Sequence, residues 1–472
     1  MAESVKISGN EEPGGRGIVV AGLSGGSGKS VVSVGIVAAL AGRGAKVAPF
    51  KKGPDYIDAG WLGLAAGRPC YNLDPYLLPR EVMIDSFRSR ICGVDYVLVE
   101  GNRGLFDGVD LEGSFSTAEL AVTLQLPVLL VVDCTKATRT VAALVAGCQN
   151  FDPRLEIGGV VLNRIGTGRH EDIVRRTVEH YTGIPVIGAL PRSSEDVFPQ
   201  RHLGITPGPE HDQVGQALEA LAARAEKHLD LERLHGIMVG LNCSPRQTPA
   251  NHPERVRIGL IRDAAFQFYY QENLEALVEA GAELVEINAL IARELPVIDA
   301  LYIGGGFPET SARALAANES FLGSVRERIE GGLPVYAECG GLIYLGRDME
   351  VDGQKYRMAG IFPVSFSLKR KPQAHGYTNL RVTTANPFYP VGTRIKGHEF
   401  RYSRIEEWPD DPGMLALSVE RGVGFAGRRD GLVYKNVLAI YTHIHALGTP
   451  QWAPGLVGAA RRYRDLPRGD QA

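Results

Sequence analysis

Apolar runs and amphipathic stretches alternate along the chain. In its first half, short apolar runs with strand character are separated by longer stretches in which apolar residues recur at helical spacing. The strand-like runs cover residues 17–22, 46–50, 94–101, 127–132, 157–162 and 184–190. This alternation predicts a parallel β-sheet covered by helices on both faces.

The alternation restarts after a polar stretch rich in Ser, Pro and Asn. A strand over 256–263, a helix over 266–284 and a strand running into a glycine-rich turn over 300–309 open a second α/β domain. The predicted segments are a disordered lead-in over 1–16, a first α/β domain over 17–235, a linker over 236–254, a second α/β domain over 255–450 and a C-terminal tail over 451–472.

Composition limits the class of protein. The 472 residues are too many for one ordinary core, and the fractions of 44% apolar and 22% charged residues are typical of globular proteins. The net charge of -3 gives no footprint for nucleic acid, and no run approaches the roughly 20 apolar residues of a membrane span. The polar N-terminus does not resemble a signal peptide, and the six scattered cysteines predict free thiols in a reducing cytoplasm.

A glycine-rich loop follows the first strand and precedes a long apolar helical stretch. The sequence GGSGKS sets Lys29 and Ser30 at the helix start, after Gly26 and Gly28. This context is typical of a phosphate-binding loop, because glycines let backbone N–H groups surround phosphates. We expect Lys29 to reach the β- and γ-phosphates of a nucleotide and Ser30 to bind Mg²⁺. Leu23 stands where the strict pattern has glycine, and a glycine-rich turn without a ligand is the alternative.

Charged residues follow the second and third strands. Lys51 lies at the end of the second strand, with Asp55 and Asp58 shortly after it, and Glu100 ends the third strand. Ligands of parallel sheets bind at the carboxyl ends of the strands. The three acids therefore predict Mg²⁺ ligands, and Lys51 a contact to the nucleotide. A solvated loop, or a carboxylate that caps a helix, is the alternative.

Two further polar residues lie at the same predicted edge. Asp107 is in the loop NRGLFDG after the third strand, and Asn163 ends the fifth strand. Asn163 could hydrogen-bond the edge of an adenine or cap a turn, and the sequence leaves both interpretations open.

A cysteine lies at a sharp strand-to-helix turn in the second domain. An apolar run ends just before Cys339, and an apolar helical stretch follows it. The N–H groups of the next helix favour the nucleophilic thiolate. His443 and His445 follow another apolar run that ends at the same edge, so either is a candidate base, and a metal site or a surface pair is the alternative. Gly305 and Gly306 end a strand there and could donate N–H groups to an oxyanion.

These motifs together resemble a known enzyme family. AECGGLIYL with the later YTHIH resembles the class I glutamine amidotransferases, whose α/β fold is flavodoxin-like. GGSGKS, FKKGPDYID and VEGNRGLFDG resemble the ATP-dependent amidoligases related to dethiobiotin synthetase. In this order they are similar to the cobyrinic acid a,c-diamide synthases. The resemblance implies an α/β protein of two domains, with a P-loop NTPase-type parallel sheet followed by a class I glutamine amidotransferase domain.

The resemblance also implies roles for individual residues. Cys339 is expected to take the γ-glutamyl group of glutamine, with His443 as general base and Gly305 and Gly306 at the oxyanion hole. His445 stands where the wider class has a glutamate, so the partner that orients His443 is open and His445 is a rival base. In the first domain, ATP with Mg²⁺ is expected to phosphorylate a carboxylate, and Asp107 to assist activation of that acceptor.

The implied acceptor is a tetrapyrrole polycarboxylate. The family implies ATP- and glutamine-dependent amidation of the a and c acetates of cobyrinate or hydrogenobyrinate. The same chemistry on sirohaem or nickel sirohydrochlorin is the alternative. Tyr377, His398 and Arg401 are candidate acceptor contacts in a basic and aromatic segment over 359–405, for which a basic surface ribbon is the alternative.

A rival function of another class is a P-loop ATPase switch with a non-catalytic amidotransferase-like domain. It would leave the cysteine of the second domain unused. The expected partners are therefore the small molecules glutamine, ATP and a tetrapyrrole, without nucleic acid or membrane, and the chain is compatible with a homodimer.

Overall fold

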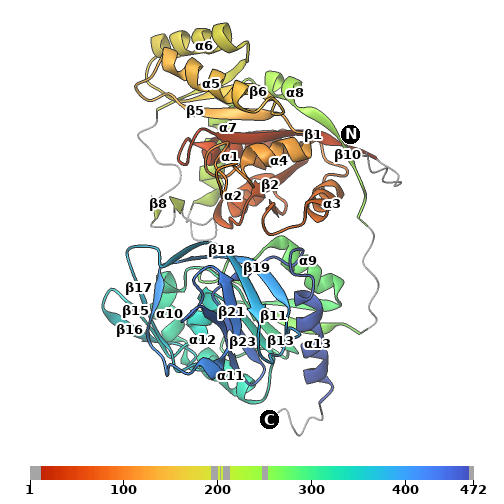
Figure 1. Cartoon of the computed structure of the whole chain (residues 1–472), viewed down its shortest axis with the longest axis vertical. Coiled ribbons are helices and arrows are strands. Elements are labelled where there is room, and N and C mark those ends of the chain that lie inside the picture. Colours follow the sequence, from red (N-terminus) through yellow and green to blue (C-terminus); the bar gives the residue numbers. More distant parts are fainter. Residues whose placement is uncertain (1–11, 193–199, 202–203, 206–212, 247–253, 467–472) are drawn as a thin grey trace. The chain divides into compact units, whose positions relative to one another are not determined.

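The computed structural model describes residues 12–192, 200–201, 204–205, 213–246 and 254–466. The chain divides into two compact units, Met1–Gln247 and Thr248–Ala472 (Figure 1). Each unit has its own β-sheet with helices packed on it, which confirms the predicted fold class of two successive α/β domains.

Unit 1 is built on parallel strands in the order β3-β2-β4-β1-β5-β6-β7. The strands are rich in Val, Ile and Leu and are buried, as a parallel sheet covered on both faces requires. Neighbouring parallel strands bring their carboxyl ends, and the loops that follow them, to one edge of the sheet. The strands are β1 (Glu12–Gly22), β2 (Val47–Lys52), β3 (Tyr71–Leu73), β4 (Tyr96–Glu100), β5 (Val128–Asp133), β6 (Ile157–Ile165) and β7 (Val186–Pro191).

The helices of unit 1 pack against this sheet. Apolar side chains of α1, α2, α7 and α8 form one core with Ile18, Leu98 and Val131 of the strands. Helices α5 and α6 lie side by side away from this core (Figure 1). The helices are α1 (Lys29–Gly42), α2 (Ile57–Ala66), α3 (Arg80–Arg90), α4 (Thr117–Leu124), α5 (Arg139–Phe151), α6 (Gly168–Thr182), α7 (Val214–His228) and α8 (Leu231–Ile237). Strand β8 (Gln200–Arg201) pairs antiparallel with β9 (Gly204–Ile205).

Part of the predicted linker belongs to the sheet of unit 1. Strand β10 (Val239–Cys243) pairs antiparallel with the beginning of β1. Strand β5 pairs with β1 only from Val19 onwards, which leaves the first residues of β1 open on that side. Because its first residues pair with β10, β1 starts at Glu12, before the expected start at residue 17. Residues 1–11 of the predicted lead-in and 247–253 of the predicted linker lie outside the described residues.

A disulfide joins two of the cysteines in unit 1. The β1–β10 pairing sets Cys243 opposite Glu12, and an isolated bridge pairs Cys92 with Gly14 nearby. Cys92 and Cys243 are disulfide-bonded across a sequence separation of 151 residues. The prediction that all six cysteines are free thiols was therefore wrong, because it rested on sequence spacing and could not include a contact made through β1.

Unit 2 contains a sheet in the order β12-β11-β13-β14-β23-β22-β21-β18-β19-β24. The first five strands are parallel, and from β23 onwards neighbours pair antiparallel. Because β14 lies beside β23, the segments that follow these two strands meet at one edge. The strands are β11 (Val256–Ile261), β12 (Ala282–Ile287), β13 (Ala300–Ile303), β14 (Val335–Glu338), β18 (Ala374–Val382), β19 (Arg394–Arg401), β21 (Leu415–Arg421), β22 (Arg429–Tyr434), β23 (Val437–Ile440) and β24 (His443–Ile444).

Helices contribute to two apolar cores in unit 2, one that contains residues of α10, α11 and α12 and one that contains residues of α9 and α13. A smaller sheet has the order β16-β15-β17-β20. The remaining elements are α9 (Gln271–Glu279), η2 (Pro308–Ser311), α10 (Ala312–Ala317), α11 (Glu319–Glu330), α12 (Gly340–Leu345), β15 (Asp348–Val351), β16 (Gln354–Arg357), β17 (Ser365–Leu368), β20 (Ser403–Glu407), η3 (Pro412–Met414) and α13 (Trp452–Arg464).

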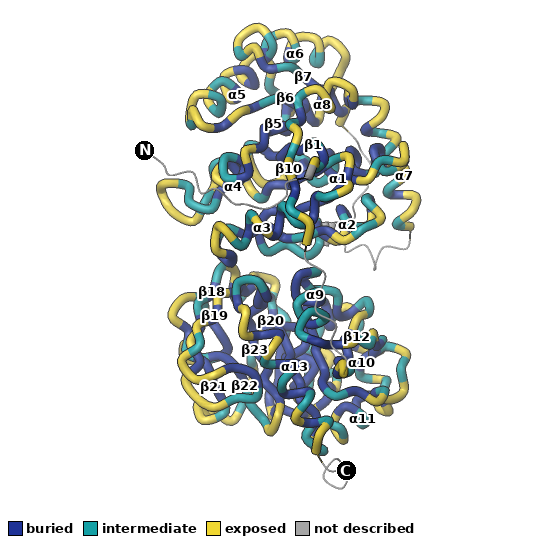
Figure 2. The backbone as a smooth tube through the Cα atoms, turned by 90° about the vertical axis from the view of Figure 1, so that its right-hand side faces the viewer, coloured by how far each residue is buried: buried dark blue, intermediate teal, exposed yellow. Residues whose placement is uncertain are grey.

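Helix α13 occupies most of the predicted C-terminal tail. Its residues Trp452, Leu456 and Ala460 are buried in the core that they share with β11 and β13. Residues 452–464 therefore complete unit 2, whereas residues 467–472 lie outside the described part of the chain. Figure 2 shows much of the backbone of the central strands as buried and many residues of α6 as exposed. None of the described helices combines the length and the hydropathy that a membrane crossing requires.

Candidate active site

Two glycines of the loop after β1 have positive φ angles. Gly26 and Gly28 have φ angles of 75° and 95°, which side chains rarely adopt, and Gly28 is the N-cap of α1. The Asn163 amide donates to the Ser27 carbonyl at 2.9 Å, and a Cβ on Gly28 would lie 2.1 Å from the same amide nitrogen. Asn163 therefore supports the loop through this contact, and its predicted contact with an adenine stays a prediction.

Lys29 begins α1 and bends back over the loop. Its Nζ atom donates to the carbonyl of Arg103 at 2.7 Å and to that of Ser24 at 3.2 Å. Burial and the nearby charge of Lys51 lower the pKa of Lys29. An anionic ligand would offset both effects. A buried lysine beside another cation is therefore in the environment expected for phosphate binding.

Lys51 lies at the centre of a group of carboxylates. Its side chain is 1% exposed, and its Nζ atom is 2.6 Å from Oδ2 of Asp58 and 2.8 Å from Oε1 of Glu100. Asp55 is farther away, at 4.0 Å. Burial acts to lower the pKa of Lys51, but the charges of Asp58 and Glu100 outweigh burial and raise it above its ordinary value. The structure thus brings together Lys51 and the three acids that the sequence selected.

The three carboxylates differ in their tendency to ionise. Burial raises the pKa of Glu100 to about 7, although Lys51 opposes the shift. Burial and the nearby charge of Asp58 raise the pKa of Asp55 to about 6. Burial also acts to raise the pKa of Asp58, but its contact with Lys51 outweighs burial and lowers it. A further cation beside the group would favour the ionised form of all three.

The oxygen atoms of this group fit a Mg²⁺ ion. Ser30 donates from Oγ to Oε1 of Glu100 at 2.9 Å, and Oε2 of Glu100 is buried without a hydrogen-bond partner among the described residues. Mg²⁺ usually takes one or two protein carboxylates together with substrate phosphates, rather than a complete protein cage. Over the described ranges, no three His, Cys, Asp or Glu side chains are grouped as a metal site. Ser30 and Glu100 suit an ion that is shared with a nucleotide.

Asp107 lines a cavity in the same unit. The cavity has a volume of about 800 Å³, and its lining includes Asp107, Arg103, Phe106 and Phe151. The ring centroids of Phe106 and Phe151 are 4.8 Å apart. Oδ2 of Asp107 accepts a hydrogen bond from the backbone N–H of Gly104 at 2.9 Å. The carbonyl of Arg103 contacts Lys29, so this cavity adjoins the phosphate-binding loop.

Cys339 forms the turn between β14 and α12. Its φ and ψ angles of 46° and -95° are unusual for a residue with a side chain, and it is 7% exposed. Its backbone N–H donates to the carbonyl of Ile440 at 2.8 Å, which ties the turn to the end of β23. A Cβ on Gly341 would lie 2.5 Å from the Ile303 carbonyl, so the turn requires a glycine there. A strained turn that presents a nucleophile between a strand and a helix is typical of acyl-transfer enzymes.

His443, Gly305 and Gly306 lie beside this turn. Burial acts to lower the pKa of His443, but its hydrogen bonds with Cys339 and Glu338 and the charges of these two residues raise it to about 10. Nδ1 of His443 is 3.2 Å from Oε2 of Glu338. A Cβ on Gly305 would lie 2.3 Å from Cε1 of His443, and the backbone nitrogen of Gly306 is beside Gly340. The predicted nucleophile, base and oxyanion-hole glycines are therefore neighbours.

His445, the rival base, lies in a separate buried pair. Its Nε2 atom is 3.7 Å from Oε1 of Glu272, and its ring centroid is 4.7 Å from that of Tyr270. The role of His445 as a base stays a prediction. The histidine whose pKa is raised by contact with Cys339 is His443.

The three candidate acceptor contacts lie within unit 2. His398 is buried and stacks on His443, with ring centroids 5.0 Å apart. Arg401 is buried, donates to backbone carbonyls of Ser403 and Gly424, and lies over an aromatic ring. Tyr377 is half-buried on β18, opposite His398 in the strand register. A contact of these residues with a large acceptor stays a prediction, since His398 and Arg401 already have partners inside the unit.

Sequence reasoning did not select Glu338, although a signal for it exists. Glu338 is the only acid of the short strand VYAE, in which all four residues are buried. A buried acid directly before a candidate nucleophile requires a partner, because an isolated buried charge is costly. Its partner could not be read from the sequence, since His443 is more than a hundred residues away.

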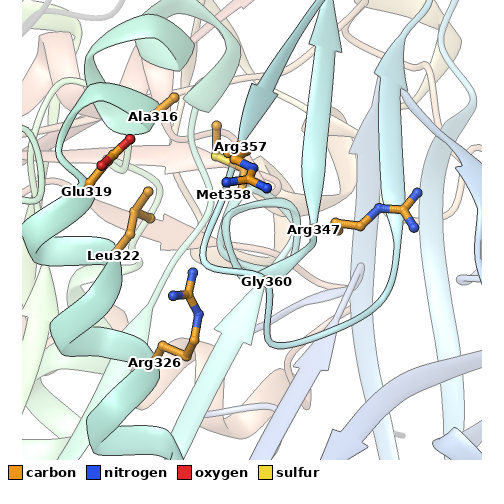
Figure 3. Close-up of a pocket in the computed structure, with 8 residues that line it drawn as sticks. All are labelled: Ala316, Glu319, Leu322, Arg326, Arg347, Arg357, Met358 and Gly360. Carbon is orange, nitrogen blue, oxygen red and sulfur yellow. The ribbon is translucent and has the colours of Figure 1, made fainter.

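Unit 2 contains a basic pocket of about 530 Å³. Arg326, Arg347 and Arg357 are among its lining residues (Figure 3). Figure 3 shows Arg326 reaching from α11 towards the loop that carries Gly360. Arg326 donates from Nε to the carbonyl of Ala359, and Arg347 forms ion pairs with acids of β15 and β20. Cys339 is not among the lining residues.

Comparison with known proteins finds two family domains in the chain. Residues 18–203 match the CobQ/CobB/MinD/ParA nucleotide binding domain, and residues 257–451 match the CobB/CobQ-like glutamine amidotransferase domain. The chain is 43% identical to the cobyrinate a,c-diamide synthase of Magnetococcus marinus, over 93% of this chain and 95% of that protein. Proteins of the same name from Archaeoglobus fulgidus and Dehalococcoides mccartyi are 38% and 39% identical, over 94% of this chain and 97% and 98% of theirs.

Proposed function

Because the chain belongs to the cobyrinate a,c-diamide synthase family, we propose that it uses ATP and glutamine to amidate the a and c acetate carboxylates of cobyrinate. The observation that carries this proposal is that Cys339, His443 and the Gly305–Gly306 turn are neighbours in one unit. Unit 1 supplies a phosphate-binding loop beside a group of acids that suits Mg²⁺. The site in unit 2 produces ammonia, and the site in unit 1 creates the electrophile that reacts with it.

In unit 2 the Cys339 thiolate attacks the γ-carbonyl carbon of glutamine, with backbone N–H groups at Gly305 and Gly306 stabilising the oxyanion. The carbon–nitrogen bond breaks as His443 gives its proton to the leaving amine, which departs as ammonia. His443 then takes a proton from water, and the resulting hydroxide cleaves the thioester to release glutamate and the free thiol.

In unit 1 an acceptor carboxylate attacks the γ-phosphorus of ATP, which forms an acyl phosphate and ADP. Lys29 and Lys51 stabilise the negative charge of the phosphates and the transferring group. Ser30, Glu100 and Asp58 would hold Mg²⁺, which neutralises phosphate charge when it is bound. Asp107 assists the acceptor in the cavity that it lines, and ammonia displaces phosphate to give the amide.

Similarity to several cobyrinate a,c-diamide synthases favours cobyrinate as the acceptor over sirohaem or nickel sirohydrochlorin. A P-loop ATPase switch would not require Cys339 and His443 to be adjacent, so it is not favoured either. We place the enzyme in the cytoplasm, where ATP and glutamine are available, and a homodimer remains part of the proposal.

Replacement of Cys339 with serine tests the proposed function. We expect the variant to lose glutaminase activity and glutamine-dependent ligation but to keep ligation with added ammonium salt. Cys148→Ser is the matched control, because Cys148 is a free cysteine in the other unit and is expected to be dispensable. Unchanged ligation from glutamine in Cys339→Ser would show that the assignment is wrong.

A further inference from the structure

We propose that Glu338, the residue directly before the nucleophile, is the positioning residue that orients His443. This inference rests on the proposed glutaminase activity and adds a role that the motif after His443 does not supply. The wider class has a glutamate two residues after the histidine, where this chain has His445. The structure offers a carboxylate from a different strand for the same task.

Strand pairing brings Glu338 to His443. Glu338 ends β14 and lies opposite Ile440, the last residue of β23, in the strand register. The chain that leaves β23 therefore carries His443 past the end of β14. Oε2 of Glu338 lies 3.2 Å from Nδ1 of His443, and the two side chains are 1% and 3% exposed. This is an almost fully buried contact between groups that are adjacent because of the sheet.

The contact determines which nitrogen of His443 serves the nucleophile. When Glu338 accepts the Nδ1–H hydrogen bond, the neutral ring carries its lone pair on Nε2. Since His443 also hydrogen-bonds Cys339, Nε2 is the atom that takes the thiol proton. The carboxylate then faces the imidazolium and stabilises its charge in a buried site. Orienting the base and stabilising its charged form is what the acidic member of a catalytic triad does.

The other neighbours of His443 are not placed to orient it. His445 pairs with Glu272 at 3.7 Å and packs against Tyr270. His398 covers the ring of His443 by stacking, and burial together with His443 lowers the pKa of His398 well below its ordinary value. A neutral stacked ring packs against the face of the imidazole and carries no charge to balance that of the imidazolium. Of the acids in the described residues that interact with His443, Glu338 has an oxygen within hydrogen-bond distance of Nδ1, whereas Glu399 accepts a hydrogen bond from the N–H of Gly424.

Glu338→Gln tests the role, with Glu272→Gln as the matched control beside His445. Glutamine keeps the shape of the side chain but presents an amide in place of the charged carboxylate. We expect the glutaminase kcat of Glu338→Gln to fall by roughly a hundredfold to ten thousandfold, with the KM for glutamine unchanged, as for other triad acids. Glu272→Gln is expected to stay near the wild-type rate. Hydrogen exchange in unit 2 that matches the wild type reports that Glu338→Gln is folded, because ligation with ammonium salt reports on unit 1.

The rate of Cys339 alkylation by iodoacetamide against pH distinguishes positioning from a merely structural role. Glu338→Gln should move this profile to higher pH, and Glu338→Asp should restore part of it. In a His443→Asn background, Glu338→Gln should have no further effect, because Glu338 acts through His443.

A wild-type kcat and an unmoved alkylation profile in Glu338→Gln would overturn the proposal, as would an equal loss in Glu272→Gln. A variant that fails to fold is replaced by Glu338→Asp, whose partial activity and intermediate profile are then decisive. If the wild-type enzyme has no glutaminase activity, the proposed function fails, whereas the alkylation profiles still report whether Glu338 controls the Cys339–His443 pair.

Discussion

Replacement of Lys51 with methionine is expected to destabilise unit 1 and to abolish ligation. Lys51 is almost completely buried, with its ammonium 2.6 Å from Asp58 and 2.8 Å from Glu100. Methionine has a similar shape but leaves these carboxylates without their cation. Removal of one partner of a buried ion pair costs about 3–5 kcal/mol. Because Asp58 is partly exposed, we expect the lower end of that range, about 3 kcal/mol.

Hydrogen exchange followed by mass spectrometry measures this loss in each unit separately. A loss of about 3 kcal/mol speeds exchange through global opening of unit 1 by roughly a hundredfold, whereas unit 2 serves as the internal reference. The effect should depend on pH. Without Lys51, the pKa of Glu100 is expected to rise above its wild-type value of about 7. The folded variant then binds protons as the pH falls, so its loss of stability is largest near pH 8 and smaller near pH 5.5.

Lys52→Met is the matched control for this experiment. Lys52 is also buried on β2, but burial lowers its pKa, so its charge is not stabilised in the same way. We expect its replacement to change exchange in unit 1 much less than Lys51→Met does. Equal protection of unit 1 in Lys51→Met and wild type at pH 8, or a larger loss at pH 5.5 than at pH 8, would refute the reasoning.

Other positions give predictions of different kinds. Burial raises the pKa of Asp430 to about 7, so wild-type unit 2 should lose stability as the pH rises from about 4 to about 7. Hydrogen exchange at pH 5 and pH 8 should show a weaker pH dependence of stability in Asp430→Asn. An unchanged pH dependence would contradict this prediction. Cys92→Ser removes the disulfide to Cys243 and should destabilise unit 1 by roughly 4–5 kcal/mol, by the entropy of closing so long a loop. Melting with and without dithiothreitol measures this, and a reductant should have no effect on the variant. Gly305→Ala would set a Cβ atom 2.3 Å from the His443 ring. The variant should lose glutaminase activity but keep ligation with ammonium salt. Intact glutaminase activity would contradict this geometry.

The features of the fold that are local in sequence were predictable. Strand, glycine-rich loop and helix around Lys29, and strand, cysteine and helix around Cys339, each occur within a short stretch, so their spacing carries the structure. The acids at Asp58 and Glu100 were predictable because the loops at the carboxyl ends of parallel strands share one edge. For these residues the order of the chain and the rule of parallel sheets are sufficient.

Features that depend on distant contacts were not predictable in the same way. Strand β10 forms because the beginning of β1 is open on one side, and the disulfide between Cys92 and Cys243 follows from that pairing. The partner of His443 is Glu338 because β14 and β23 are neighbours in the sheet, which sequence spacing does not reveal. The burial of His398 likewise depends on β19 lying beside β24.

The central claim is tested most directly by following the amide nitrogen of glutamine into the tetrapyrrole. Purified enzyme is incubated with ATP, Mg²⁺, cobyrinate and glutamine labelled with ¹⁵N at the amide, and the product is analysed by mass spectrometry. The account predicts a product with two carboxyl-to-amide conversions, both labelled, that requires ATP and is absent with Cys339→Ser. An unlabelled or unchanged tetrapyrrole, or labelled product from Cys339→Ser, would contradict it.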